Sequence, residues 1–252
     1  MVTSYKEMTL QMYEHLSKIA ESDTDDIEKQ IQMVSVLTGK SVKEVEDLPI
    51  SVYHDLAKKT VFLMREPEIE QIKSNTVKIN ERVYVITNDV TKITTAQYID
   101  FQEYMKQGKN LANVLSTLLV PKGEKYGEAD FLEVKKDIER LPICTALGLN
   151  AFFFAKICEI NRQYATLLNV GTEERGGEDE SEGADTVVGT FGDRWGWISV
   201  VDTVSETKRQ SMNETFAQPI IETFNILAYT RDTNEEQRRR IEQQKQMNNG
   251  GF

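Results

Sequence analysis

An acidic segment constrains the fold of this chain more than any other feature. Residues 172–185 read TEERGGEDESEGAD, and their carboxylates, less the charge of the one arginine, carry −6 of the formal net charge of −11. The segment has no aromatic residue, and its first threonine is its one β-branched residue. Such a composition buries too little apolar surface to offset the entropy lost on ordering. The sequence therefore predicts a mobile tether between two folded parts.

The tether predicts a division of the chain into three parts. With 252 residues the chain can form one large domain or two smaller ones, each with a core. We expect a helical body over 1–170, an acidic linker over 171–186, and a small C-terminal helical module over 187–252 that holds both tryptophans. The predicted fold class is mainly α-helical with one β-hairpin, an α+β fold.

Capping residues mark the first helices. Asp25 precedes a helix that Gly39 ends, and Ser41 with Glu44 forms a capping box for a short helix. Pro49 opens the next helix. A helix is therefore expected to start after each of these capping signals.

Apolar and polar residues alternate at residues 76–87, where the helical spacing of apolar residues ends. This pattern predicts a β-hairpin, with Tyr84 in its second strand as a candidate interface residue. Two strands are marginally stable alone, so the hairpin either packs on the helices or extends a sheet of another subunit. Helical spacing then returns and predicts a helix over 110–120, with 121–123 as a turn.

A long apolar helix is expected to follow, ending near Leu168. Its most apolar run, 143–155, is shorter than the about 20 residues that span a bilayer, so a buried core helix is predicted and no membrane partner. After the linker we expect a helix over 195–204, a second helix from Pro219, and a separate polar terminal helix that Asn234 caps.

Charge and cysteine content restrict the partners and the compartment. The 41 acidic residues exceed the 30 basic ones, so the surface repels phosphate backbones and specific nucleic-acid binding is not expected. Cys144 and Cys158 lie too far apart on one predicted helix to bridge each other. With no signal peptide recognised, they indicate synthesis in a reducing cytoplasm.

No catalytic residue, cofactor or metal site is predicted. The TGKS segment at 38–41 lacks the second glycine of a P-loop, because Val34 stands at its position. Histidine chemistry would depend on His15 and His54 alone, and both are expected to be solvated or interfacial. We therefore expect a protein that is not an enzyme.

One enzymatic alternative remains open. A cryptic carboxylate site would need acids that converge in a pocket with perturbed pKa values. Its candidates are Asp100 and Glu103 with Asp137 or Glu159.

Two clusters supply the other candidate interface residues. Residues 191–197 read FGDRWGW, and their tryptophans either pack the helices of the C-terminal module or, with the arginine, anchor an interface. The polar terminal helix needs i,i+4 pairs or partners for stability. The candidates from these two clusters are Arg194, Trp195, Trp197, Arg238 and Arg239.

Several segments resemble virion and tail-assembly proteins of tailed bacteriophages, notably those of crAss-like gut phages. The resemblance rests on a layout in which a helix with an LTG segment leads to a helix that starts LPI, then to a strand pair. The matching stretches are LTGKSVKEVEDLPISVYHDLAKKTVFL (37–63), KINERVYVITNDV (78–90), TTAQYIDFQEYM (94–105), LLVPKGEKYGEAD (118–130), the helix from LPI to FFF, and PIIETFNILAYTRD (219–232).

The resemblance implies a structural protein of the phage neck or tail. Its expected form is a ring near the portal that binds its own copies and the adjoining portal and tail proteins, made in the host cytoplasm and located in the virion. The alternative is a soluble tail assembly chaperone that is absent from the mature particle.

Overall fold

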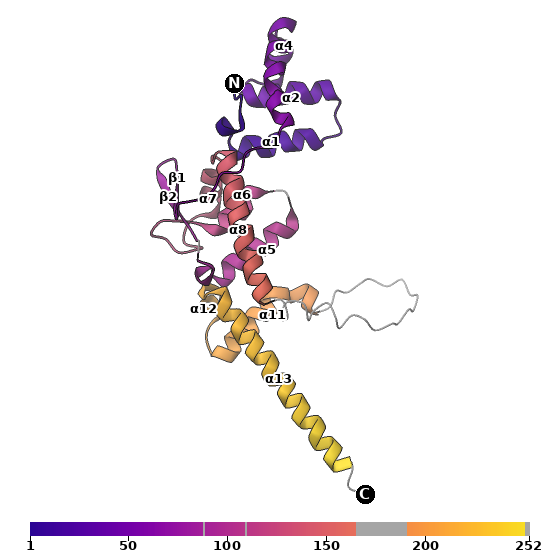
Figure 1. Ribbon diagram of the computed structural model, residues 1–252, viewed down its shortest axis with the longest axis vertical. Helices are drawn as coiled ribbons and strands as arrows, with labels where there is room; N and C mark the ends of the chain where they lie inside the picture. Colours follow the sequence, from indigo (N-terminus) through magenta and orange to yellow (C-terminus); the bar gives the residue numbers. More distant parts are fainter. Residues whose placement is uncertain (88, 109, 165–190, 250–252) are drawn as a thin grey trace, which may run out of the picture. The chain divides into compact units, whose positions relative to one another are not determined.

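The computed structural model is mostly helical with a small three-stranded antiparallel sheet (Figure 1). The described residues are 1–87, 89–108, 110–164 and 191–249. The predicted acidic tether over 171–186 lies outside them.

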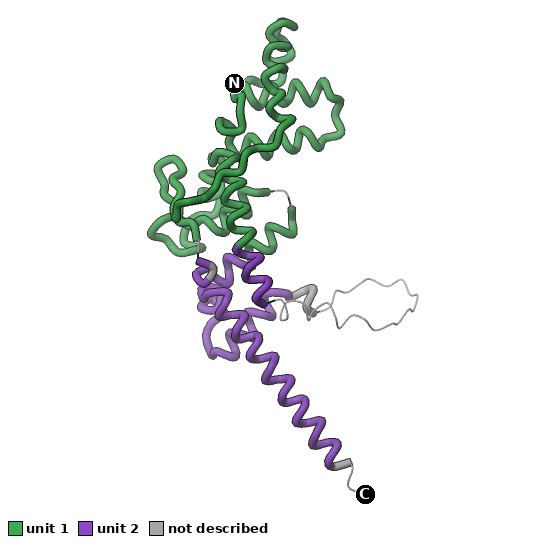
Figure 2. Tube along the Cα trace, viewed as in Figure 1, with its two compact units in different colours: residues 1–88, 100–155 green, residues 89–99, 156–252 purple. Residues whose placement is uncertain are grey.

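The chain forms two compact units, coloured separately in Figure 2. Unit 1 comprises 1–88 and 100–155, and unit 2 comprises 89–99 and 156–252. These boundaries differ from the predicted division at the linker. Unit 2 takes in residues from far before the linker because its core includes Ile93, Tyr98 and Ile160 as well as side chains of the C-terminal helices.

Most helices and all strands fall within one unit. Unit 1 contains the 3-10 helix η1 Tyr5–Glu7, α1 Leu10–Glu21, α2 Asp26–Thr38, α3 Val42–Glu46, α4 Ile50–Lys58, η2 Lys59–Met64, β1 Thr76–Ile79, β2 Arg82–Ile86, α6 Leu111–Leu118, β3 Leu119–Pro121 and α7 Phe131–Ile138. Unit 2 contains η3 Val90–Lys92, α11 Phe191–Lys208, α12 Met212–Ala217 and α13 Ile220–Asn249. The unit boundary falls within α5 Thr95–Gln107 and within α8 Ile143–Gln163.

The predicted capping signals are confirmed in α2, α3 and α4. The Asp25 carboxylate accepts the Glu28 N–H at 2.8 Å, and Gly39 ends α2 with φ 71°. Ser41 and Glu44 form both bonds of the capping box. Pro49 directly precedes α4. Local chemistry therefore sets the ends of these helices.

The sheet has a third strand that the sequence did not predict. β2 pairs antiparallel with β1 and, on its other edge, with β3, which opposes Tyr84 to Pro121. The predicted hairpin is present as β1 and β2, but the helix expected to reach residue 120 ends at Leu118, and the next residues add a third strand to the hairpin. Leu119 is buried, and the second edge of β2 has backbone N–H and C=O groups that need partners. Residues 119–121 therefore pair with this edge as a strand and do not extend α6.

A pair of backbone hydrogen bonds joins the starts of two helices in each unit, and we call this arrangement the helix-start clasp. In unit 1 the Leu10 N–H donates to the Leu141 carbonyl at 2.8 Å. The Ile143 N–H donates to the Met8 carbonyl at 2.9 Å. The first N–H groups of a helix have no partner inside that helix. The clasp satisfies one such group in α1 and one in α8.

Unit 2 repeats the clasp with α5 and α13. The Thr95 N–H donates to the Gln218 carbonyl at 2.8 Å, and the Ile220 N–H donates to the Ile93 carbonyl at 2.9 Å. A proline stands at the centre of one side in both clasps, Pro142 in unit 1 and Pro219 in unit 2. Proline lacks an N–H and suits a position next to a helix start.

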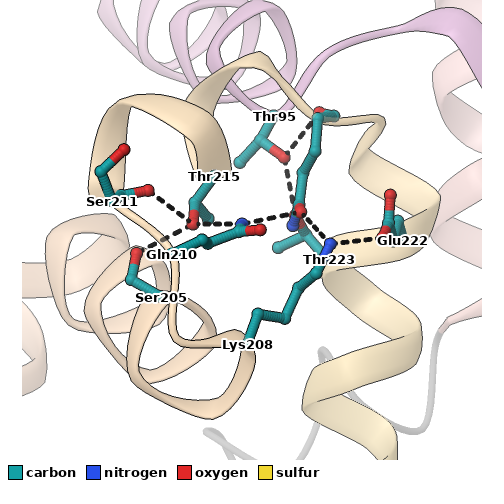
Figure 3. A network of polar contacts seen from close by, with 9 residues as sticks. Thr95, Ser205, Lys208, Gln210, Ser211, Thr215, Glu222 and Thr223 are labelled. Carbon is teal, nitrogen blue, oxygen red and sulfur yellow. Dashed lines mark hydrogen bonds and ion pairs between the residues drawn. The ribbon is translucent and has the colours of Figure 1, made fainter.

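A buried polar network surrounds the clasp of unit 2 (Figure 3). The hydroxyls of Thr95 and Thr223 lie 2.7 Å apart, and Thr223 also accepts from the Gln218 side-chain amide at 2.7 Å. The amide of Gln210 donates to Thr215 at 2.7 Å, and Lys208 donates to the Gln218 side-chain oxygen at 2.9 Å. Buried polar groups are costly unless paired, so this network makes the packing of α5, α12 and α13 specific.

Helix α8 is long and apolar enough to cross a bilayer by length and composition alone. Leu149 and Phe153 are buried in unit 1, while Ile157 and Ile160 are buried in unit 2. On the same helix Phe154 is 50% exposed. Burial along one stripe is the pattern of a core helix, in line with the sequence interpretation.

Helix α13 is continuous where two helices were expected. It runs from Ile220 through Asn234, the residue predicted to cap a separate helix. Residues 230–234 contain no glycine or proline, and Arg231 lies 3.9 Å from Glu235 across the expected break. With no breaker and a favourable i,i+4 pair, the helix continues.

A close approach at Gly148 in α8 is testable by mutation. The Glu70 N–H donates to the Cys144 carbonyl at 3.2 Å, and a Cβ on Gly148 would collide with the Glu70 carbonyl. We expect Gly148→Ala to lower the free energy of unfolding by about 1–3 kcal/mol in urea titrations. As a control, the exposed Ala151→Gly should cost about 0.5–1 kcal/mol through helix propensity alone. A stabilising Gly148→Ala would contradict the steric argument.

The polar network gives a second stability prediction. Thr223→Val keeps the shape of a fully buried side chain but removes the acceptor of the Gln218 side-chain amide, while the Thr95 hydroxyl keeps its bond to the Gln218 carbonyl. The free energy of unfolding should fall by about 1–3 kcal/mol. Thr207→Val, on the exposed surface of α11, should change it by less than about 0.5 kcal/mol. Equal effects of the two variants would show that the buried network adds nothing to stability.

Candidate functional site: an exposed arm and an acid-aromatic pocket

Trp197 packs inside unit 2. Its ring meets Tyr98 edge-on at a centroid distance of 5.6 Å and lies 6.4 Å from Phe224. Gly196, the preceding residue, kinks α11 with φ 37° and ψ −113°, a conformation that favours glycine. Of the two interpretations of the tryptophans, this geometry supports packing for Trp197.

The other two candidates of that cluster precede the kink. The backbone of Arg194 and Trp195 is part of α11, but their side chains lie outside the described part of the structure. The interface interpretation of these two residues stays a prediction.

Tyr84 is fully buried in unit 1. Its hydroxyl donates to the Asp137 carboxylate at 2.7 Å, and Asn80 donates to the other oxygen of that carboxylate at 3.3 Å. Burial, followed by the bond to Asp137, raises the pKa of Tyr84 to about 12. The side chain serves the interior of unit 1 and offers no surface to a partner.

Arg238 and Arg239 lie in a fully exposed part of α13. Every residue of Asn234–Met247 is exposed, and we call this segment the exposed arm. Figure 1 shows the end of α13 extending away from α11 and α12 of the same unit. Arg238, Arg239, Arg240 and Lys245 against Glu242 give residues 238–247 a net charge of +3, opposite in sign to the whole chain.

The arginines of the exposed arm differ in their partners. Arg239 lies 3.9 Å from Glu235, and Arg240 donates to Glu236 at 2.9 Å. Arg238 has no carboxylate partner among the described residues. It is therefore the arginine whose guanidinium is most available to another molecule.

The carboxylates of the enzymatic alternative have separate partners. Asp137 accepts from Tyr84, Glu103 pairs with Lys106 at 2.9 Å, and Glu159 pairs with Lys156 at 3.2 Å. Within the described ranges, no three His, Cys, Asp or Glu side chains gather closely enough to hold a metal ion. Both histidines are exposed.

Asp100 contributes instead to a pocket of unit 1, with a volume of about 330 Å³. We call it the acid-aromatic pocket. It lies between α5, α6, the loop after β3, and α7. Its lining residues are Asp100, Tyr104, Ser116, Leu119, Val120, Pro121, Lys125, Tyr126, Gly127, Ala129, Phe131 and Val134.

The lining carries one carboxylate, that of Asp100, and one ammonium, that of the exposed Lys125. The Tyr126 hydroxyl donates to Oδ2 of Asp100 at 2.6 Å, which fixes the carboxylate. In the described structure no donor meets the other oxygen, Oδ1. Burial and then the bond to Asp100 raise the pKa of Tyr126, so its hydroxyl keeps its proton and continues to donate.

Aromatic rings form another wall. Tyr104 stacks on Phe131 with a centroid distance of 5.7 Å and an interplanar angle of 12°. Burial, then the charge of Asp100, raises the pKa of Tyr104. Aromatic faces beside a carboxylate attract flat or compact cations. The pocket can therefore bind a cationic group such as a guanidinium.

Sequence reasoning missed this pocket because its lining comes from segments scattered over residues 100–134. The one local signal is the GEKYGE segment at 123–128, where Gly123 and Gly127 have φ of 94° and 86°. These two glycines allow the tight turns that flank Tyr126.

Comparisons with protein-family models, with curated proteins and with solved structures find no match for this chain. The resemblance to phage proteins therefore stays a prediction from the quoted segments.

The raised pKa of Tyr84 predicts a loss of stability in alkali. The unfolded phenol has a pKa near 10, and a folded pKa of about 12 favours the protonated side chain. Its contribution is fully present below about pH 10 and is lost as pH rises towards 12. Tyr84→Phe should make the decline of unfolding free energy between these pH values shallower.

The matched control for that titration is Tyr229→Phe, because Tyr229 is 68% exposed. We expect this variant to follow the wild type at every pH. Thermal melts at stepped pH, followed by circular dichroism, provide the measurement. An unchanged alkaline decline in Tyr84→Phe would show that other tyrosines carry it.

Proposed function

We propose that this chain is a non-enzymatic structural protein of the neck or tail of a tailed bacteriophage. In this proposal it assembles into a ring near the portal through contacts with its own copies and with adjoining portal or tail proteins. The observation that carries the proposal is the exposed arm, fourteen consecutive residues of α13 with no buried side chain. The quoted phage-like segments supply its context.

The energetics of the arm favour a binding role. Isolated helical segments of this length are marginally stable in water. The i,i+4 pairs along it, such as Arg239 with Glu235 and Arg240 with Glu236, contribute about 0.3–0.5 kcal/mol each. Packing against another protein is what usually stabilises a helix. A partner surface would therefore hold the arm far more firmly than its own pairs do.

A tail assembly chaperone is the second candidate, and the polarity of the arm favours it. Ile241 and Met247 are the arm's large apolar residues. Transient complexes have smaller and more polar interfaces than permanent ones. The same arm could then hold a partner before assembly and release it.

Mass spectrometry of purified mature particles of the parent phage tests the proposal against this alternative. A ring component should be present at a fixed ratio to the portal protein in every preparation. Recovery from the infected-cell lysate, with none in the particles, would identify the chaperone instead.

Truncation tests the role of the arm in assembly. A chain that ends at Thr233 loses the exposed side chains of the arm, so its thermal melting midpoint should stay within about 2 °C of the wild type. Sedimentation velocity should show loss of the self-associated species. A chain that ends at Met247 keeps the arm and is the control. Full self-association of the Thr233 variant would remove the arm from the assembly contact.

A further inference from the structure

We propose that the acid-aromatic pocket of unit 1 receives the Arg238 guanidinium from the exposed arm of a second copy of the chain. This inference rests on the self-association in the proposed function and identifies the two surfaces that meet. The ligand class is a planar cation on a protein side chain.

The pocket has enough room for an arginine side chain. Its volume of about 330 Å³ is at the lower end of the range for ligand pockets, about 300–1,000 Å³. Phe131 and Val134 supply apolar walls, and Leu119 and Pro121 form part of the lining. Such a pocket suits the aliphatic stem of an arginine with a charged head at one end.

The Asp100 carboxylate and the rings match a guanidinium, and the ammonium of Lys125, which also lines the pocket, belongs to an exposed side chain. Oδ1 of Asp100 is free to accept while Tyr126 holds Oδ2. The stacked rings of Tyr104 and Phe131 offer aromatic faces close to this carboxylate. Arginine pairs with a carboxylate and stacks on an aromatic ring at once, because its guanidinium is planar. A lysine ammonium, a point charge, can make only part of this contact.

The donor surface has the complementary charge. Residues 238–247 carry +3, and the whole arm, which includes Glu235 and Glu236, carries +1 in a chain of −11, so the arm is attracted to the acidic remainder of another copy. Arg238 is exposed and has no intrachain carboxylate partner among the described residues, unlike Arg239 and Arg240. Binding through Arg238 therefore breaks no ion pair of the arm.

The two surfaces differ, so the contact is heterologous. Each copy carries one pocket and one arm, and each can bind two neighbours through different patches. Heterologous contacts repeat until the rotation closes into a ring, or they continue as a helical filament. This is the symmetry that the proposed ring requires.

Full-length variants in sedimentation velocity at low salt test the contact. Arg238→Gln and Asp100→Asn should each weaken association at least tenfold. The side-chain amide introduced by Asp100→Asn keeps an oxygen acceptor for Tyr126, so the pocket should stay folded. Lys245→Gln removes one positive charge from the same arm and should weaken association less than threefold. Arg238→Lys should fall between the wild type and Arg238→Gln.

Mixing the two defective variants is the decisive measurement. The intact arm of Asp100→Asn can enter the intact pocket of Arg238→Gln, and this forms one contact for each pair of chains. We therefore expect the mixture to form dimers and no larger species, while each variant alone stays monomeric. Rescue of this kind identifies pocket and arm as partners on different copies.

Other outcomes separate the inference from the proposed function. If the wild type assembles and both variants assemble equally well, the pocket contact is wrong and self-association stands. If the wild type stays monomeric at every concentration, the proposed self-association itself fails. If mixing gives no dimer and Arg238→Gln lowers the melting midpoint of the monomer, the arginine binds within its own chain.

Tyr104→Leu covers the case in which Asp100→Asn does not fold. It removes one stacked ring and no charge, and it should weaken association at least threefold at an unchanged circular dichroism spectrum. A folded Tyr104→Leu with wild-type association would exclude the aromatic wall from the contact.

Discussion

The helix-start clasp is the interaction on which both units depend. A helix start leaves N–H groups without partners, and burying them unpaired costs several kcal/mol. In each unit the clasp pairs one such group of a helix with a carbonyl next to the start of another helix, more than 120 residues away in the sequence. It therefore adds a long-range pair of hydrogen bonds to the local caps that Thr9 provides for α1 and Thr94 for α5. The core residues of unit 2, including Tyr98 and Phe224, pack where this pair brings α5 and α13 together.

Local chemistry predicted the ends of helices, but the pairing of distant segments did not follow from it. Asp25, Gly39 and the capping box act within a few residues, so their effects could be predicted directly. Residues 119–121 form a strand because they pair with the edge of β2, which lies more than thirty residues earlier in the chain. Likewise, no local pattern brings Thr95 beside Thr223. Contacts between distant segments determine these features, and local sequence patterns do not reveal such contacts.

The candidate site shows the same limit. Arginines on a polar helix predicted an exposed surface, and the structure places Arg238 and Arg239 there. The hairpin pattern predicts Tyr84 at an open strand edge, yet alternate residues of a strand point inward, and the bond to Asp137 holds this ring in the interior of unit 1. The acid-aromatic pocket gathers side chains that are ordinary one at a time. Its chemistry exists because Asp100 and Tyr126 meet.

Helix α13 is packed at its base and exposed in its later part. The clasp holds Ile220, and Thr223 and Phe224 are buried, whereas the exposed arm Asn234–Met247 spans roughly 20 Å at 1.5 Å per residue. A bend of about 5° where the arm begins moves its tip by roughly 2 Å. Such a bend leaves the buried side chains of the base in place. In the proposed assembly, arms of this kind can adapt to neighbours of unequal spacing or curvature without repacking the core of unit 2.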